Sequence, residues 1–144
     1  MRIERLSLDS FGRFQGKVVE LGPGLNVIRG SNEAGKSTVE RFVRGMLYGF
    51  AKPGLKKRMM LDEHERYRPW SGAAYGGRLV FALDDGRRFR VERAFDPHAV
   101  RVFDEATGQE LAFDEDRRSE PAFAQALART VPSCERRCRC GTSR

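Results

Sequence analysis

An octapeptide near the N-terminus constrains this chain more than any other feature. It runs from Gly30 to Ser37, reads Gly-Ser-Asn-Glu-Ala-Gly-Lys-Ser and fits the pattern G-x-x-x-x-G-K-[ST]. Its two glycines let the backbone curl so that successive N–H groups point inward at phosphate oxygens, and a following helix adds its positive N-terminal end. The sequence therefore predicts a phosphate-binding loop, or P-loop, within a nucleotide site.

The chemistry of such a loop assigns a role to each of its polar side chains. Lys36 is expected to reach the β- and γ-phosphates and is the candidate catalytic residue, whereas the Ser37 hydroxyl is expected to bind Mg²⁺. The alternative is a Gly-rich turn that caps an ordinary helix, with Ser31 or Asn32 as the N-cap. The predicted nucleotide-binding residues of this segment are Gly30, Ser31, Asn32, Glu33, Ala34, Gly35, Lys36, Ser37 and Thr38.

The residues on both sides of the octapeptide suit a strand, a loop and a helix in that order. Leu25, Val27 and Ile28 follow the turn signal Gly22-Pro23-Gly24 and predict a short buried strand of an α/β sheet. Apolar residues then recur at spacings of three and four, which predicts a helix with one buried face. Pro53-Gly54 is expected to end this helix. The helical positions are Val39, Phe42, Val43, Met46, Leu47 and Phe50.

Length and composition are those of an ordinary globular domain. The 144 residues are 40% hydrophobic and 33% charged, which suits one domain with a real core. No apolar run approaches the roughly 20 residues needed to span a bilayer, and the first residues lack the apolar core of a signal peptide. We therefore expect a cytoplasmic protein.

The charge balance favours anionic partners. The formal net charge is +7, although part of the excess comes from four arginines among the last nine residues. A stretch from Lys52 to Arg68 combines cations with nearby aromatic residues such as Tyr67 and Trp70, which permits phosphate neutralisation together with base stacking. The alternative for this stretch is a surface loop whose aromatics fold back onto the sheet. His64 is expected to be exposed to solvent.

The pattern from Gly76 onward predicts a β-meander. Residues 79–83 and the alternating residues from Phe89 to Val91 form a hairpin around Asp84-Asp85-Gly86, and two further strands are expected at Val100 to Phe103 and Glu110 to Phe113. The run that ends in Asp84 and Asp85 also resembles a Walker B strand, whose acids hold Mg²⁺. The immediate return strand favours the hairpin.

A resemblance to a known family rests on the whole N-terminal region. The run from Met1 into Asp9-Ser10-Phe11-Gly12-Arg13-Phe14, the strand from Val18 to Leu21 and the P-loop with its flanks resemble the start of SMC-, SbcC- and RecF-type ATPases. The pattern is most similar to YhaN-like AAA proteins of bacteria. Residues 46–50, Trp70-Ser71-Gly72 and the hairpin that ends at Phe95 extend the likeness, which covers roughly residues 1–130.

The resemblance implies the fold, the ligands and one further site residue. It implies an α/β P-loop NTPase of the ABC/SMC head type, of which this chain is the N-terminal lobe with an antiparallel meander. It also implies ATP and Mg²⁺ as ligands, a missing C-terminal ATPase lobe or second head as partner, and DNA as a further partner through that assembly. Arg13 resembles the family's basic residue near the nucleotide.

Several family motifs are not recognisable in this sequence. The Q-loop glutamine, the signature motif, the Walker B Asp-Glu pair and the switch histidine are missing, and Gln125 comes too early for a Q-loop. The last eleven residues hold all three cysteines and almost no apolar residue. We therefore expect a truncated chain, with a lobe over residues 1–130 and a disordered Cys/Arg-rich tail over residues 131–144.

Three functional hypotheses remain open on the sequence alone. The first is an ATP-binding segment of a DNA-repair type ATPase that does not hydrolyse ATP by itself. The second is a small self-sufficient P-loop NTPase or kinase in which Asp84 or Asp85 is the metal-binding acid. The third is a non-functional gene fragment that cannot bury its sheet.

Overall fold

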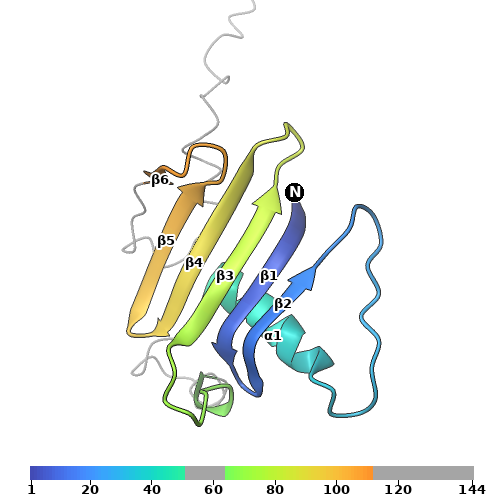
Figure 1. Ribbon diagram of the computed structural model, residues 1–144, viewed down its shortest axis with the longest axis vertical. Coiled ribbons are helices and arrows are strands. Elements are labelled where there is room, and N and C mark those ends of the chain that lie inside the picture. The colour runs from blue at the N-terminus through green and yellow to red at the C-terminus, as the bar shows by residue number, and fades with distance from the viewer. Residues whose placement is uncertain (51–63, 112–144) are drawn as a thin grey trace, which may run out of the picture.

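A computed structural model describes residues 1–50 and 64–111 of the chain. One six-stranded sheet forms the body, and a single long helix crosses one of its faces (Figure 1). The elements are β1 (Arg2–Phe11), β2 (Phe14–Glu20), α1 (Lys36–Tyr48), β3 (Tyr75–Ala82), β4 (Arg88–Asp96), β5 (His98–Asp104) and β6 (Glu110–Leu111). The antiparallel sheet and the helix agree with the predicted small α/β domain.

The sheet is antiparallel throughout, in the order β2-β1-β3-β4-β5-β6. The predicted hairpin is confirmed, because β3 and β4 pair directly and the Leu83 N–H donates to the Arg87 carbonyl at 2.8 Å. Gly86 takes the positive φ of 88° that this turn requires. The predicted strand at Val100 to Phe103 lies within β5, and β6 contains the beginning of the predicted last strand.

One face of the sheet and one face of α1 form the core. Leu6, Leu79, Val91 and Val102 stand in register across four neighbouring strands, and all four are buried. On α1, the spacing of Val39, Phe42 and Met46 turns these residues toward the sheet, as the sequence predicts.

Phe11, at the end of β1, is the centre of an aromatic cluster at one end of this core. Its ring centroid lies 5.2 Å from those of Phe42 and Tyr67 and 5.6 Å from those of Tyr75 and Phe95. Edge-on, stacked and tilted contacts at these distances are favourable for aromatic rings. The cluster therefore connects β1, α1, β3 and β4 near the turn between β1 and β2.

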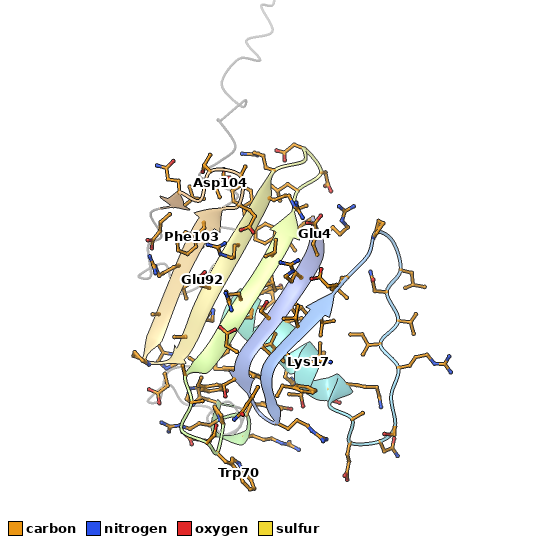
Figure 2. The ribbon with its side chains drawn as sticks, in the orientation of Figure 1. Glu4, Lys17, Trp70, Glu92, Phe103 and Asp104 are labelled. Carbon is orange, nitrogen blue, oxygen red and sulfur yellow. The ribbon has the colours of Figure 1, made fainter. Side chains whose placement is uncertain are left out.

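The opposite face of the sheet is covered by ion pairs. Arg78 of β3 lies 3.0 Å from Asp9 of β1, and Arg101 of β5 lies 2.7 Å from Glu110 of β6. Glu4 accepts hydrogen bonds from Arg2 and Arg88, and these bonds lower the pKa of its carboxyl. Figure 2 shows Glu4 and Glu92 on this face, away from α1. Many of the chain's arginines are therefore matched by carboxylates on the sheet.

The predicted strand before the octapeptide is wrong. Residues 23–30 form no strand, and Leu25, Val27 and Ile28 are 91%, 69% and 48% exposed. A strand needs a neighbour that takes up its N–H and C=O groups, and within residues 1–50 and 64–111 no strand pairs with this run. The segment instead lies outside the sheet, between the end of β2 and the start of α1 (Figure 1).

The helix ends slightly earlier than predicted. Its last residue is Tyr48, and Gly49 follows with a φ of 72° while donating its N–H to the Gly45 carbonyl at 2.8 Å. A glycine with positive φ commonly ends a helix, so the end of α1 is determined by Gly49 itself. The predicted stop at Pro53-Gly54 lies outside the described residues. In the part of the chain that is described, no helix has the length and apolar character needed to cross a membrane.

Candidate phosphate-binding site

The octapeptide forms a curled loop that leads directly into α1. Glu33 and Gly35 have φ angles of 65° and 94°, and α1 begins at Lys36. The Ala34 N–H donates to the Ser31 carbonyl at 3.2 Å, and the Val39 N–H donates to the Gly35 carbonyl at 3.1 Å. Glycine adopts such a positive φ without the strain that a Cβ brings. Gly35 thus supplies one of the two positive φ angles of the curled loop, and Glu33, which is not a glycine, supplies the other.

The ammonium group of Lys36 is held by this loop. Its Nζ donates to the carbonyl oxygens of Gly30 and Ser31, each at 2.8 Å. The side chain therefore folds back along the loop, and the positive charge is fixed inside the curl. Residues 30–34 are exposed, so the loop is open to a ligand from solvent.

The N-terminus of α1 is free to receive an anion. Gly35 is the N-cap, no side chain within the described residues caps the helix, and the first turn carries no acidic residue. The first N–H groups of a helix lack intrahelical partners and carry a partial positive charge. Neither Ser31 nor Asn32 is therefore the N-cap of α1, as the alternative required.

The turn between β1 and β2 supports the loop from one side. The guanidinium Nη1 of Arg13 donates to the carbonyl oxygen of Glu33. Gly12 lies against α1, because a Cβ at this position would come within 3.2 Å of Thr38 Cγ2. The structure thus brings Arg13, which the sequence connects to the loop only through the family resemblance, into contact with the loop itself.

The hydroxyls of Ser37 and Thr38 occupy the first turn of α1. Ser37 is exposed, while Thr38 is half-buried against the turn at Gly12. Across residues 1–50 and 64–111, no three His, Cys, Asp or Glu side chains gather as a metal site. Mg²⁺ at Ser37 therefore stays a prediction, in which the nucleotide phosphates would supply most of the oxygen ligands.

Asp84 and Asp85 lie far from the loop along the sheet. Asp84 pairs with the N-terminal ammonium of Met1 at 3.0 Å, beside the start of β1, whereas the loop contacts the turn at the other end of that strand. Asp85 pairs with Arg87 at 2.6 Å, and hydrogen bonds from Arg87 lower the pKa of the Asp85 carboxyl. The structure does not bring these acids to the phosphate site.

The basic stretch from Lys52 to Arg68 is described only from His64 onward. Within that part Arg68 pairs with Asp96 at 2.5 Å, and the Tyr67 ring stacks on Phe11. The expectation of an exposed His64 was wrong, because its side chain is 13% exposed and its ring lies 5.2 Å from that of Tyr75. Tyr67 thus follows the alternative in which aromatics fold back onto the sheet.

Sequence reasoning missed the contact between residues 67–71 and the β1–β2 turn. The Gly12 N–H donates to the Tyr67 carbonyl at 2.7 Å, and Gln15 Nε2 donates to Ser71 Oγ at 2.6 Å. The only sequence signal was the family-like triplet Trp70-Ser71-Gly72. The predicted domain boundary at residue 130, Gln125 and the cysteine-rich tail lie outside the described residues.

Two comparisons with known proteins agree with the geometry. A family model described as an AAA domain matches residues 1–62. The chain is also 34% identical over 94 residues to the uncharacterized protein YhaN of Bacillus subtilis (strain 168), a match that covers 65% of this chain and 9% of that protein. These matches support an N-terminal AAA-type head segment and confirm the predicted resemblance. The AAA match suggests a nucleotide-binding, ATPase-type domain.

Proposed function

We propose that this chain is the nucleotide-binding lobe of a P-loop ATPase and that it binds Mg-ATP through residues 30–38. The observation that carries the proposal is the position of Lys36, whose ammonium lies within hydrogen-bonding distance of the Gly30 and Ser31 carbonyls at the open N-terminus of α1. A fixed cation and free backbone N–H groups at one helix end form a site for a polyphosphate. The AAA-domain match supports the same assignment.

Three side chains have distinct roles in this proposal. Lys36 neutralises the β- and γ-phosphates, and Ser37 supplies one oxygen ligand to Mg²⁺. Arg13 stands beside the loop through its bond to the Glu33 carbonyl and adds a second positive charge at the nucleotide. Lys36 and Mg²⁺ would also stabilise charge on the phosphates during hydrolysis, which is the sense in which Lys36 is catalytic.

Hydrolysis requires a carboxylate that activates water, and we propose that another lobe or a second head supplies it. Asp84 and Asp85 stand at the other end of β1 from the loop, each with a cationic partner. This placement favours binding without turnover over the self-sufficient NTPase or kinase. The exposed run of Leu25, Val27 and Ile28 beside the loop offers that lobe an apolar contact. DNA metabolism remains the proposed setting of the assembly.

The test is a titration of the purified chain with a fluorescent ATP analogue and Mg²⁺, with phosphate release followed in the same samples. Wild-type chain is expected to bind saturably without releasing phosphate. Lys36→Ala is expected to remove binding, whereas Lys17→Ala, which removes an exposed cation from β2, is expected to retain it. Equal binding by wild-type chain and Lys36→Ala, both folded by circular dichroism, would refute the proposed site.

A further inference from the structure

Trp70 stands out on the surface of the molecule. It is the only tryptophan of the chain, and its side chain is fully exposed, with a relative accessibility of 101%. Tryptophan is usually highly buried, because its large ring gains most from leaving water. Figure 2 shows Trp70 projecting from the end of the molecule at which β1 turns into β2. An indole presented in this way is available to a flat ligand.

The loop that carries Trp70 is anchored on both sides of the indole. Before it, Pro69 is buried and the Tyr67 carbonyl accepts the Gly12 N–H at 2.7 Å. After it, Ser71 Oγ accepts a hydrogen bond from Gln15 Nε2 at 2.6 Å. These contacts hold the residues on both sides of Trp70 against the β1–β2 hairpin, so the exposure of its ring is not that of a loose chain end. A loop that is held on both sides loses less entropy when it binds a ligand.

The same turn that anchors this loop also supports the phosphate loop. Gly12 contacts Tyr67, and Gln15 contacts Ser71. Arg13 and Phe14, which lie between Gly12 and Gln15 in sequence, contact Glu33 and Gly35 of the phosphate loop, respectively. Residues 12–15, which are the turn and the start of β2, thus contact both the phosphate loop and the loop that carries Trp70. The base of a nucleotide whose phosphates lie in the loop would reach Trp70 by extending along residues 12–15.

We propose that Trp70 is the stacking surface for the purine base of the bound nucleotide. The inference rests on the proposed function, since it adds a base contact to the same site. An aromatic side chain that stacks on a base contacts the π-face, which every base has, and does not contact the hydrogen-bonding edge of the base. Stacking alone therefore discriminates little between adenine and guanine.

The experiment distinguishes the contribution of the base to binding from that of the phosphates. Equilibrium dialysis of the full chain is carried out with Mg-ATP, Mg-GTP and Mg-triphosphate, the last of which has no base. Trp70→Ala is expected to weaken ATP and GTP binding about tenfold, in the range that base stacking gives, and to leave triphosphate binding unchanged. Trp70→Phe is expected to keep most of the affinity. Tyr48→Ala is the matched control, because Tyr48 is an exposed aromatic residue at the end of α1 that lies away from the phosphate loop.

The unique indole supplies a second readout. Mg-ATP is expected to change the intrinsic tryptophan fluorescence of the wild-type chain, and Mg-triphosphate is expected to leave it unchanged. Unchanged ATP affinity in Trp70→Ala would overturn the inference, as would an equal loss for ATP and triphosphate, which would reveal a purely structural role. A wild-type chain that binds neither ligand would refute the phosphate site itself, so the two failures are distinguishable.

Discussion

The ring of Phe14 lies against Gly35, the second glycine of the phosphate loop. A Cβ built on Gly35 would come within 2.3 Å of Phe14 Cζ, a separation that real Cβ atoms do not show. Phe14 is the first residue of β2, and Gly35 immediately precedes α1. The sheet thus forms one wall of the loop, and a side chain at position 35 would have to displace the Phe14 ring.

Gly35→Ala is expected to lower both stability and nucleotide affinity. The new methyl group meets the Phe14 ring, and the φ of 94° is strained for any residue with a Cβ. We expect a loss of about 1–3 kcal/mol in the free energy of unfolding, measured by urea denaturation, with at least tenfold weaker Mg-ATP binding. Gly24→Ala is the control, because φ is 83° there and among the described residues nothing lies within 4 Å of a Cβ. Equal losses of stability in Gly35→Ala and Gly24→Ala would show that the contact with Phe14 is not the cause of the loss.

Arg13→Ala is expected to weaken Mg-ATP binding about five- to tenfold with little change in stability. The substitution removes a charge-assisted hydrogen bond to the Glu33 carbonyl and a cation beside the phosphates. Lys17→Ala removes an exposed cation from the middle of the same strand pair, and it is expected to leave the affinity unchanged. Isothermal titration calorimetry measures both. Equal small losses of Mg-ATP affinity in Arg13→Ala and Lys17→Ala would show that Arg13 acts only through the overall charge of the chain.

Alkaline pH is expected to destabilise the fold through Tyr75. Burial raises the pKa of this phenol above its ordinary value of 10.0, and its hydroxyl donates to the His64 carbonyl at 3.1 Å. In the unfolded chain the group loses its proton near pH 10, so its contribution is complete below pH 10 and falls as the pH rises further. Tyr75→Phe is expected to cost about 1 kcal/mol at pH 7 and to flatten the alkaline decline. Urea denaturation at pH 7 to 11 measures this, and an unaltered alkaline decline in the variant would contradict it.

Acid is expected to weaken the charged face of the sheet. Hydrogen bonds from Arg2 and then from Arg88 lower the pKa of Glu4 below its ordinary value of 4.5. The folded chain therefore holds fewer protons than the unfolded chain just below pH 4.5, and stability falls as the pH falls through that region. Glu4→Gln is expected to make the acid transition shallower in a pH titration followed by circular dichroism. A transition of unchanged slope would rule out a contribution from this carboxyl.

Local patterns predicted the elements whose contacts are close in sequence. The helix after the loop follows from apolar residues at spacings of three and four, and the β3–β4 hairpin follows from Asp84-Asp85-Gly86 between alternating strands. The curl before α1 also follows in part from local residues, because Lys36 bonds to the Gly30 and Ser31 carbonyls within the octapeptide. In such segments the residues that contact one another are close in sequence, so a local pattern is enough to predict them.

Elements that depend on distant partners were predicted less well. Leu25, Val27 and Ile28 have the composition of a buried strand, yet composition does not supply the neighbour that a strand needs, and these residues are exposed. His64 carries charged neighbours in sequence, but Tyr75 and His98 surround it in space. The contacts of Gln15 with Ser71 and of Gly12 with Tyr67 join residues more than fifty positions apart, and no local pattern encodes them.

The most direct test of the central claim is a ¹H–¹⁵N correlation spectrum of the wild-type chain with and without Mg-ATP. If the nucleotide binds as proposed, the amide signals of residues 30–38 shift most, with Gly35, Lys36 and Ser37 foremost, because their N–H groups point at the phosphates. Smaller shifts are expected at Arg13 and Trp70. A folded chain in which saturating Mg-ATP leaves these loop amides unchanged would contradict the proposed site.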